Sequence, residues 1–530
     1  MNRTSLVLAL LAIGALAAVL LGSDPLSRSL LINSLVLAAG TCAVAIPLGT
    51  ILAVVIARTD VAGRRLAAAG VGLLLVLPLL TQLAGWDALL GKLGWWSLES
   101  GSIAQPWLAG MRGAIFVHGM AALSWATLII GLGLLQVDPQ LEEAALLDAS
   151  PLTVLLRVSL VRAWPFLVAA VVWAAISTTT EMTVTNIYLV NTYTEQIYNG
   201  FALNSDPLQV GWRIWPGILL LLVLGLAVLL VLRQMADAWA TALLRPAIVF
   251  HWRGLRPLVS LLLWGIVALL IALPIASLVL KAGFVSGRTA SGELEHGWSL
   301  ARTFEVLIEA PQLFRYEFFW SLLTAAVAAT LAVLIAIALT WLALRGGWRI
   351  APLGVALTIG LATPGPLVGV SIIWLLNRES IPGFTWLYDR TIAGPALAQM
   401  VRALPIAVLV VWPALASIPS RLLEAAELDG LSRWRQLLHV ALPQRRLAIV
   451  AAWLLAAAVA FGDLASSLLV IPPGMDTIQR RVFGLVHAGV DEQVAAACLL
   501  MAAGYAGVAA ICWRLLARHS SADSPSRDVY

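Results

Sequence analysis

The composition of the chain excludes an ordinary soluble protein. Of its 530 residues, 61% are hydrophobic and 12% are charged, whereas soluble domains are about 45–50% apolar and about 25% charged. A net charge of +5 would suggest a nucleic-acid partner in a soluble protein, but arginines in the inner loops of a membrane protein explain it more simply. The three cysteines, Cys42, Cys498 and Cys512, lie in apolar segments without metal-ligand spacing. We therefore expect a membrane protein with no metal site and no nucleic-acid partner.

Apolar segments long enough to cross a bilayer, which takes about 20 residues each, recur along the whole chain. In the first half they lie near residues 5–22, 30–57, 66–83, 111–135, 162–180 and 213–232. In the second half they lie near residues 257–281, 319–344, 351–375, 394–417, 447–470 and 496–516. These segments predict an all-α integral membrane protein with about twelve transmembrane helices. We expect the first helix to be retained, because no convincing small-residue cleavage site ends it.

The loops between these segments differ in charge. Loops on the side of the N-terminus carry more Lys and Arg than loops on the other side, which predicts that both termini are cytoplasmic. Arg402 is the one basic residue inside a predicted span. It lies about one helical turn from the end of that span, where we expect it to pair with an acid or to reach an interface.

Four landmarks recur in the same order at nearly constant spacing. The pairs are Ser34 with Ser321, Pro78 with Pro364, Glu143 with Glu424, and Glu181 with Asp463. Their spacing falls from 287 residues to 281 and then rises to 282, so the first copy lacks one residue after Glu143. A long repeat of this kind indicates a tandem duplication. We expect two homologous halves at residues 1–240 and 257–518, a cytoplasmic linker at 241–256 and a polar cytoplasmic tail at 519–530.

One cytoplasmic loop in each half, at residues 136–161 and 418–446, carries a shared motif. In the second copy, Glu424-Ala425-Ala426 begins a short amphipathic helix, and Gly430 supplies a bend that a residue with a Cβ atom resists. The small alanines let another surface approach closely, and the acid suits the positive end of the helix dipole. A helix lying on the membrane surface would explain one such loop. Two copies at matched positions favour docking of a partner.

At these residues the chain resembles the permease subunits of ABC importers that work with a soluble binding protein. The shared element is the EAA loop, which reads Glu-Ala-Ala, three residues, Gly, and then a distal Val-x-Leu-Pro. Residues 424–443 match it, whereas in the first loop Ala149 replaces the Gly and Val161 replaces the Pro. We therefore expect the chain to leave the short helix of the first of these two loops at a slightly different angle. We call residues 136–161 and 418–446 the first and second EAA loops.

The resemblance implies that each EAA loop docks on an ATPase subunit. The implied contacts are Glu143, Ala144, Ala145, Asp148 and Ala149 in the first loop, and Glu424, Ala425, Ala426, Asp429 and Gly430 in the second. It further implies two copies of a cytoplasmic ABC ATPase, a periplasmic or lipid-anchored substrate-binding protein, surrounding membrane lipids and a multi-pass location in a bacterial inner membrane. The chain itself is expected to have no catalytic residues and to bind no cofactor. The spacing from Gly85 to Lys92 does not fit a nucleotide-binding P-loop, so we expect ATP to be used by the partner.

The motifs also give expectations about the solute and its path. Residues 461–467 with Ile471-Pro472-Pro473-Gly474 look most like ferric-iron permeases, and thiamine, polyamine and sulfate permeases remain alternatives. Ionisable groups near spans are functional candidates because they are costly there. The candidates for the translocation path are Glu181 and Thr180 in the first half, Asp463 and Ser466 in the second, and a helix break at Pro364 and Gly365. The two acids would favour a cationic solute, although they could simply cap helix ends at the water boundary.

Two other classes of protein are less consistent with the sequence. An ion-coupled secondary transporter also has repeats and about twelve spans, but its coupling site requires ionisable residues deep in the membrane, and this chain has almost none. A membrane enzyme would place catalytic acids in a large outer loop. The acids of residues 293–309 with His296 could be interpreted in that way, but a solvated loop explains them more simply.

Overall fold

The computed structural model describes residues 24–99, 106–202, 249–250, 254, 256–288 and 294–522, with isolated positions at 217, 223 and 225. Six helices in these residues are long and apolar enough to cross a membrane, and the number reaches ten if each of four bent helix pairs is counted as one span. Each of the ten overlaps a predicted span. The predicted spans near 5–22 and 213–232 fall outside the described residues, apart from the isolated positions.

Helices dominate both halves of the chain. In the first half they are α2 (Pro25–Arg58), α3 (Arg64–Val76), α4 (Leu79–Leu90), α5 (Trp95–Glu99), α6 (Gly110–Leu135), α7 (Pro139–Asp148), α8 (Pro151–Val154), η1 (Leu155–Ser159), α9 (Leu160–Arg162), α10 (Trp164–Thr179), α11 (Thr183–Ile187) and α12 (Tyr193–Ala202). The second half begins with α14 (Arg256–Val267), η2 (Ala268–Ala272), α15 (Leu273–Ala282), α16 (Leu300–Leu313), α17 (Arg315–Ala343), η3 (Gly347–Ile350), α18 (Ala351–Ala362) and α19 (Gly365–Leu376). It ends with α20 (Phe384–Arg390), α21 (Ala393–Ala416), α22 (Ser420–Leu428), α23 (Arg433–Gln436), η4 (Leu437–Ala441), α24 (Leu442–Gln444), α25 (Arg446–Gly462), α26 (Ile478–Ala488) and α27 (Asp491–Ala522).

Two predicted features need correction. Residues 293–309, predicted as a solvated loop, contain β2 (Leu294–Trp298), which pairs with β1 (Phe284–Arg288) in an antiparallel hairpin with Phe284 opposite Trp298, and the greater part of α16. The span predicted at 447–470 ends at Gly462, because Asp463 adopts an extended conformation and turns follow it.

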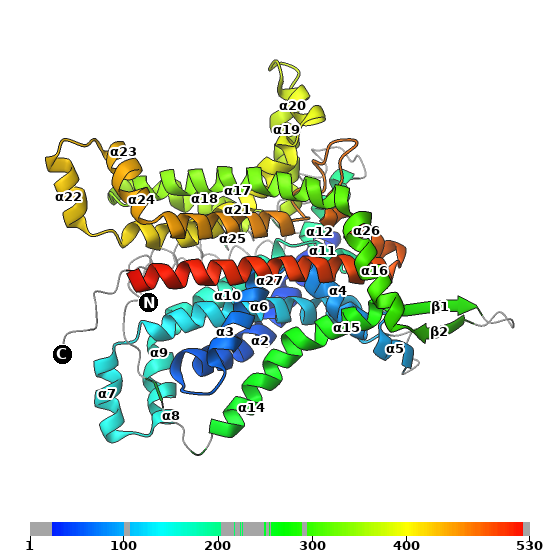
Figure 1. Ribbon diagram of the computed structural model, residues 1–530, viewed down its shortest axis with the longest axis horizontal. Helices are drawn as coiled ribbons and strands as arrows, with labels where there is room; N and C mark the ends of the chain where they lie inside the picture. Colours follow the sequence, from blue (N-terminus) through cyan, green and yellow to red (C-terminus); the bar gives the residue numbers. More distant parts are fainter. Residues whose placement is uncertain are drawn as a thin grey trace.

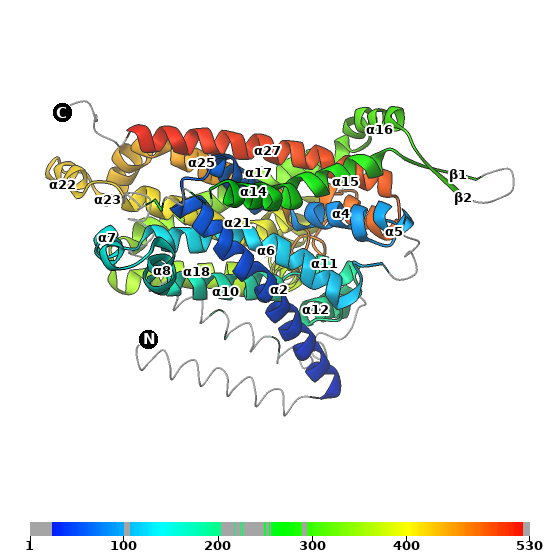
Figure 2. The same cartoon turned by 90° about the horizontal axis from the view of Figure 1, so that it is seen from below.

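The helices lie in two groups, with both EAA loops at one end. Figure 1 shows α2, α3, α6 and α10 on one side, α17, α18, α21 and α25 on the other, and α27 running between them. Helices α7, α8, α22 and α23 emerge at one end of the molecule, and the β1–β2 hairpin projects from the other, in both views (Figures 1 and 2). We call these the loop end and the hairpin end. Helix α27 finishes at the loop end.

The two halves are interleaved. Helices α15 and α27, from the second half, pack on α4 of the first, and α10 of the first half contacts α18 of the second. In the second half, α17, α21 and α25 meet through buried alanines such as Ala329, Ala407 and Ala456. Small residues at helix interfaces let backbones approach closely, which favours association where no water is present to drive it.

Several local structures recur at the spacing of the sequence repeat. The π-helical turns η1 and η4 are offset by 282 residues. Ser34 and Ser321 play matched roles, because their hydroxyls accept the backbone N–H of Tyr193 (3.3 Å) and of Ile478 (2.9 Å). The serine landmarks are therefore explained by hydrogen bonds that hold the start of a helix at the hairpin end.

Two broken helices also match. Helices α3 and α4 meet at 106°, and the helices on either side of Pro364 meet at 115°. Pro78 and Pro364 cap the second helix of each pair with nearly identical backbone angles, φ −54° and ψ 141° against φ −56° and ψ 141°. The predicted break at Pro364 and Gly365 is confirmed as a helix break. Proline causes it because the ring removes a hydrogen-bond donor and restricts the preceding residue.

Candidate functional site

A cavity of about 260 Å³ lies where the two halves meet. Its wall includes the α3–α4 break together with parts of α6, α10, α18, α21 and α25. Both predicted acids, Glu181 and Asp463, line it, as does Thr180. Residues far apart in the sequence therefore converge on one space between the halves.

The two carboxylates line the cavity and also hold backbone in place. Glu181 accepts hydrogen bonds from the backbone N–H groups of Thr183 (2.7 Å) and Val184 (3.1 Å). Asp463 accepts a hydrogen bond from the Ser466 hydroxyl. Each acid therefore caps a turn, as one interpretation of the sequence expected, and faces the cavity, as the other expected.

Arg402 lies beside these acids and does not snorkel to an interface. Its Nη1 donates to the carbonyls of Gly360 (3.3 Å) and Thr363 (3.2 Å), which the break leaves without helical partners. Arg402 also interacts electrostatically with both Glu181 and Asp463. When both carboxyl groups are ionised they outnumber the one guanidinium, and the site then favours a cation over an anion.

The matching break in the first half is capped without charge. The side-chain amide of Gln82 donates to the carbonyls of Leu74 (3.2 Å) and Leu77 (2.9 Å). These two residues precede Gly360 and Thr363 by 286 positions, so the same backbone groups are satisfied in each half by a different side chain. The charge on the wall of the cavity is therefore asymmetric.

Aromatic and imidazole groups complete the wall from the first half. Trp125 and Trp173 pack against each other with tilted rings, at a ring-centroid distance of 4.5 Å and with 36° between their planes. His118 is buried, and its Nε2 lies 3.9 Å from Glu181. Indole faces attract ammonium groups, so carboxylates beside a pair of indoles suit an organic cation. No sequence signal marks these three residues, because they lie in apolar spans without a motif.

The breaks fix the cavity by packing against the opposite half. Pro78 contacts Gly462, where a Cβ atom would lie 3.0 Å from the proline ring. In the other direction, the backbone N–H of Gly365 donates to Thr180 (3.3 Å). A Cβ atom at Gly365 would lie 2.5 Å from that of Ala465, so glycine is required there. Pro364, Gly365 and Ser466 are thus packed behind the cavity wall rather than on it.

The EAA loops present matched surfaces. In the first loop Glu143, Ala144 and Asp148 are exposed, and Ala145 and Ala149 are half-buried. In the second loop Glu424, Ala425, Asp429 and Gly430 are exposed, and Ala426 is buried. Leu147 and Leu428, which are offset by 281 residues, are 86% and 89% exposed. An exposed leucine at the same position of each loop suits burial by a partner.

The two loops leave their helices differently, as the substitution at Ala149 predicts. Gly430 has φ +79° and closes α22 by donating to the carbonyl of Glu427 (2.9 Å), while Leu431 donates to Ala426 (3.0 Å). This is the Schellman arrangement, which favours glycine. Ala149 is instead extended at φ −140°. The next helices are both preceded by serines in matching conformations, Ser150 and Ser432, so the residue that the first loop lacks corresponds to Leu431.

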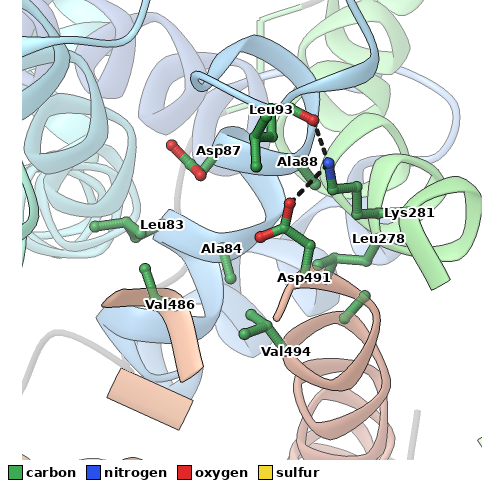
Figure 3. Close-up of a pocket in the computed structure, with 11 residues that line it drawn as sticks. Leu83, Ala84, Asp87, Ala88, Leu93, Leu278, Lys281, Val486, Asp491 and Val494 are labelled. Atoms are coloured by element: carbon green, nitrogen blue, oxygen red, sulfur yellow. Dashed lines mark hydrogen bonds and ion pairs between the residues drawn. The ribbon is translucent and has the colours of Figure 1, made fainter. Parts of the chain in front are cut away.

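A smaller buried charge cluster joins the halves at the hairpin end. Figure 3 shows Lys281 of α15 between Asp491 of α27 and the carbonyl of Leu93, with Asp87 of α4 nearby. The distance from Lys281 Nζ to Asp491 Oδ2 is 2.9 Å. The cavity there is about 20 Å³, which is room for roughly one water molecule. The cluster therefore ties α4 to α15 and α27 and is too small to admit a solute.

Comparison with known proteins finds a family match in the C-terminal part of the chain. Residues 328–520 match the family described as binding-protein-dependent transport system inner membrane component. The similarity to this permease family covers that stretch and not the whole chain. The match contains α21, the second EAA loop, α25 and α27.

Individual relatives cover about a third of the chain. The putrescine transport system permease protein PotI of Escherichia coli (strain K12) is 28% identical over 200 residues, which is 37% of this chain and 71% of the relative. The spermidine/putrescine transport system permease protein PotC of Haemophilus influenzae is 29% identical over 178 residues, which is 33% of this chain and 65% of the relative. These similarities support an inner-membrane transport component rather than an enzyme.

Proposed function

We propose that this chain is the permease of an ABC importer, that it supplies both halves of the translocation path, and that its solute is a small organic polycation of the putrescine or spermidine class. The observation that carries the proposal is the cavity between the halves. It combines an excess of carboxylates with a pair of packed indoles, and the EAA loops extend from the helices around it.

A polyamine fits better than the ferric iron suggested by residues 461–474. The relatives are named for putrescine and spermidine transport. An ammonium group also finds suitable partners in Glu181, Asp463 and the Trp125–Trp173 pair, because carboxylates and indole faces both attract it. Ferric iron and thiamine remain the comparison solutes for the experiment.

In the proposed mechanism, a soluble binding protein delivers the solute at the hairpin end, and two ATPase subunits dock at the loop end, one on each EAA loop. The exposed faces of α7 and α22 supply these contacts. Closure of the ATPases would displace the loops, and α6, α10, α21 and α25 would carry that movement to the cavity wall. The helix breaks at Pro78 and Pro364, where each half contacts the other, would then let the two halves move relative to each other. Residues 1–240 and 257–518 serve as the two halves, with both termini cytoplasmic.

Uptake by proteoliposomes tests the proposal. The chain is reconstituted with its cognate ATPase and binding protein, and ATP-dependent accumulation of labelled putrescine is compared with that of ferric iron and thiamine. We expect uptake of putrescine, lost by roughly tenfold or more in Glu181→Gln with Asp463→Asn, because one charge contact contributes about 1.5–3 kcal/mol. Glu305→Gln, at an exposed acid of α16, is the matched control. Uptake driven by an ion gradient without ATP would instead favour a secondary transporter.

A further inference from the structure

We infer that Arg58, Glu142 and Ser159 form a clamp that positions the first EAA loop against the transmembrane helices, and that movement of this loop reaches the cavity through the clamp. The inference rests on the proposed function, and it assigns a role to three residues outside the EAA motif.

The clamp joins four elements through buried polar contacts. Arg58, the last residue of α2, and Glu142 of α7 both have fully buried side chains, and Arg58 Nη1 lies 3.0 Å from Glu142 Oε2. The hydroxyl of Ser159 in η1 donates to Glu142 Oε1 at 2.5 Å. Arg58 also donates through Nη2 to the carbonyl of Leu134 at the end of α6. One side chain, Arg58, therefore links α7 to α2 and α6.

The linker between the halves packs on the same place. The backbone N–H of Phe250 donates to the carbonyl of Arg58 at 2.8 Å, and Thr59 and Phe250 form a parallel β-bridge. The Phe250 side chain is buried with Leu134, Val154 and Leu155. The base of the first loop is thus enclosed by α2, α6, η1 and the linker.

The positions of the second loop that match the clamp are apolar or exposed, and a buried arginine at another position, Arg445, donates to the carbonyl of Ser417 at the end of α21 (3.0 Å). The sequence repeat aligns Glu142 with Leu423 and Ser159 with Ala441, and it aligns Arg58 with Arg345, which is exposed. The second loop is held in other ways. Buried Leu437 and Ala441 pack in the apolar core, and the loop has the glycine bend and the proline that the first lacks.

The position of the clamp indicates transmission rather than docking. Glu142 faces inward on α7, while its neighbour Glu143 and Leu147 are exposed on the same helix. A partner that contacts the exposed side therefore pulls on α2 and α6 through Glu142. Helix α6 carries His118 and Trp125 into the cavity wall, so the clamp joins the docking surface to the proposed solute site.

The test replaces both charges at once. A single substitution leaves a buried charge unpaired and is strongly destabilising, whereas an apolar pair is often tolerated. The double variant Arg58→Met with Glu142→Leu is reconstituted as above; leucine is the residue that the second loop has at the position of Glu142. Two quantities are measured, the amount of putrescine transported per ATP hydrolysed and the melting temperature. We expect a nearly unchanged melting temperature and a fall in the transport ratio of at least roughly twofold. A wild-type ratio in a stable double variant would overturn the inference.

Two further variants make the test specific. Ser159→Ala, which gives the residue of the second loop, removes one hydrogen bond and keeps the ion pair. It should lower the amount of putrescine transported per ATP hydrolysed by a smaller factor. If the double variant does not assemble, this variant tests the inference instead, and an unchanged value would overturn it. Arg256→Met with Asp60→Leu removes a neighbouring exposed ion pair (3.6 Å) and should leave the ratio unchanged. If the wild-type complex shows no ATP-dependent uptake, the proposed function has failed instead.

Discussion

The two EAA loops reach similar structures by different chemistry. The second loop has a left-handed glycine at Gly430, the proline of its distal motif, apolar contacts beneath and a hydrogen bond from buried Arg445 to the carbonyl of Ser417. The first has lost the glycine and the proline but contains a buried ion pair between Arg58 and Glu142. The π-helical turn occurs in both loops, so the proline is not its cause. A divergent motif therefore does not by itself indicate a weakened loop.

The cavity wall differs between the halves in the same way. Arg402 and Gln82 satisfy equivalent helix-end carbonyls, one with a charge and one without. The sequence repeat aligns His118 with Gln399 and Trp125 with Ile406, so the imidazole and this indole come from the first half only. The scaffold repeats, whereas the chemistry around the solute does not. A single fused chain can maintain such asymmetry, because each half diverges independently.

The largest difference between the loops should appear when one charge of the clamp is removed. Glu142→Leu alone leaves Arg58 buried without its ion-pair partner, so it should lower the free energy of unfolding by about 3–5 kcal/mol. Arg345→Met, at the aligned but exposed arginine, should change it by less than about 0.5 kcal/mol. Denaturant titration in detergent measures both. Equal effects would show that the loops are not distinguished by burial of charge.

A second contrast concerns the helices that follow matched threonine caps, α12 after Thr192 and α26 after Thr477. Burial raises the pKa of Glu195 in α12 to about 7, whereas the aligned residue of α26 is Arg480. The folded state therefore binds a proton that the unfolded state releases, and stability falls as the pH rises from about 4.5 to about 7. Glu195→Gln should remove this dependence and raise the melting temperature at pH 8 but not at pH 4.5. An identical pH profile for both proteins would contradict the assignment.

The smallest predicted difference is between the residues that follow the docking helices α7 and α22, Ala149 and Gly430. Gly430→Ala places a Cβ atom at φ +79° and should destabilise the protein by about 1–2 kcal/mol. Ala149→Gly affects an extended residue and should cost less than about 1 kcal/mol, mainly through added freedom of the unfolded chain. Melting curves of the two variants compare them directly. A larger loss of stability from the change at Ala149 than from the change at Gly430 would mean that the backbone conformation at these positions does not distinguish the two loops.

Much of the architecture could be predicted from local signals. Apolar length located the spans, proline located the breaks at Pro78 and Pro364, and the repeat spacing paired Glu181 with Asp463. The inward side of the first loop could not be predicted in this way. Adjacent acids in the sequence Glu142-Glu143 are chemically alike, and only packing against α2 buries one and exposes the other. The Trp125–Trp173 pair was missed for a similar reason, since indoles within apolar spans are read as lipid-facing or core residues.

The boundaries that failed have a physical cause as well. Residues 464–470 are apolar enough to extend the span that begins at 447, but Asp463 and Ser466 hydrogen-bond to each other and favour a turn over continued helix. The role of Arg402 depends on carbonyls that become available only when the chain breaks at residues 363–364. Both features follow from hydrogen bonds within the second half, a local one at Asp463 and longer-range ones at Arg402, rather than from hydrophobic length.

The most direct test of the central claim, that both loops dock on an ATPase, is disulfide cross-linking at the two exposed leucines. Cys42, Cys498 and Cys512 are first replaced by alanine, and then Leu147→Cys and Leu428→Cys are each paired with a cysteine in the coupling cleft of the cognate ATPase. We predict that both positions cross-link to the ATPase and that ATP binding changes the yield at each. Absence of cross-links from both positions, in a complex that still transports solute with ATP, would contradict the claim.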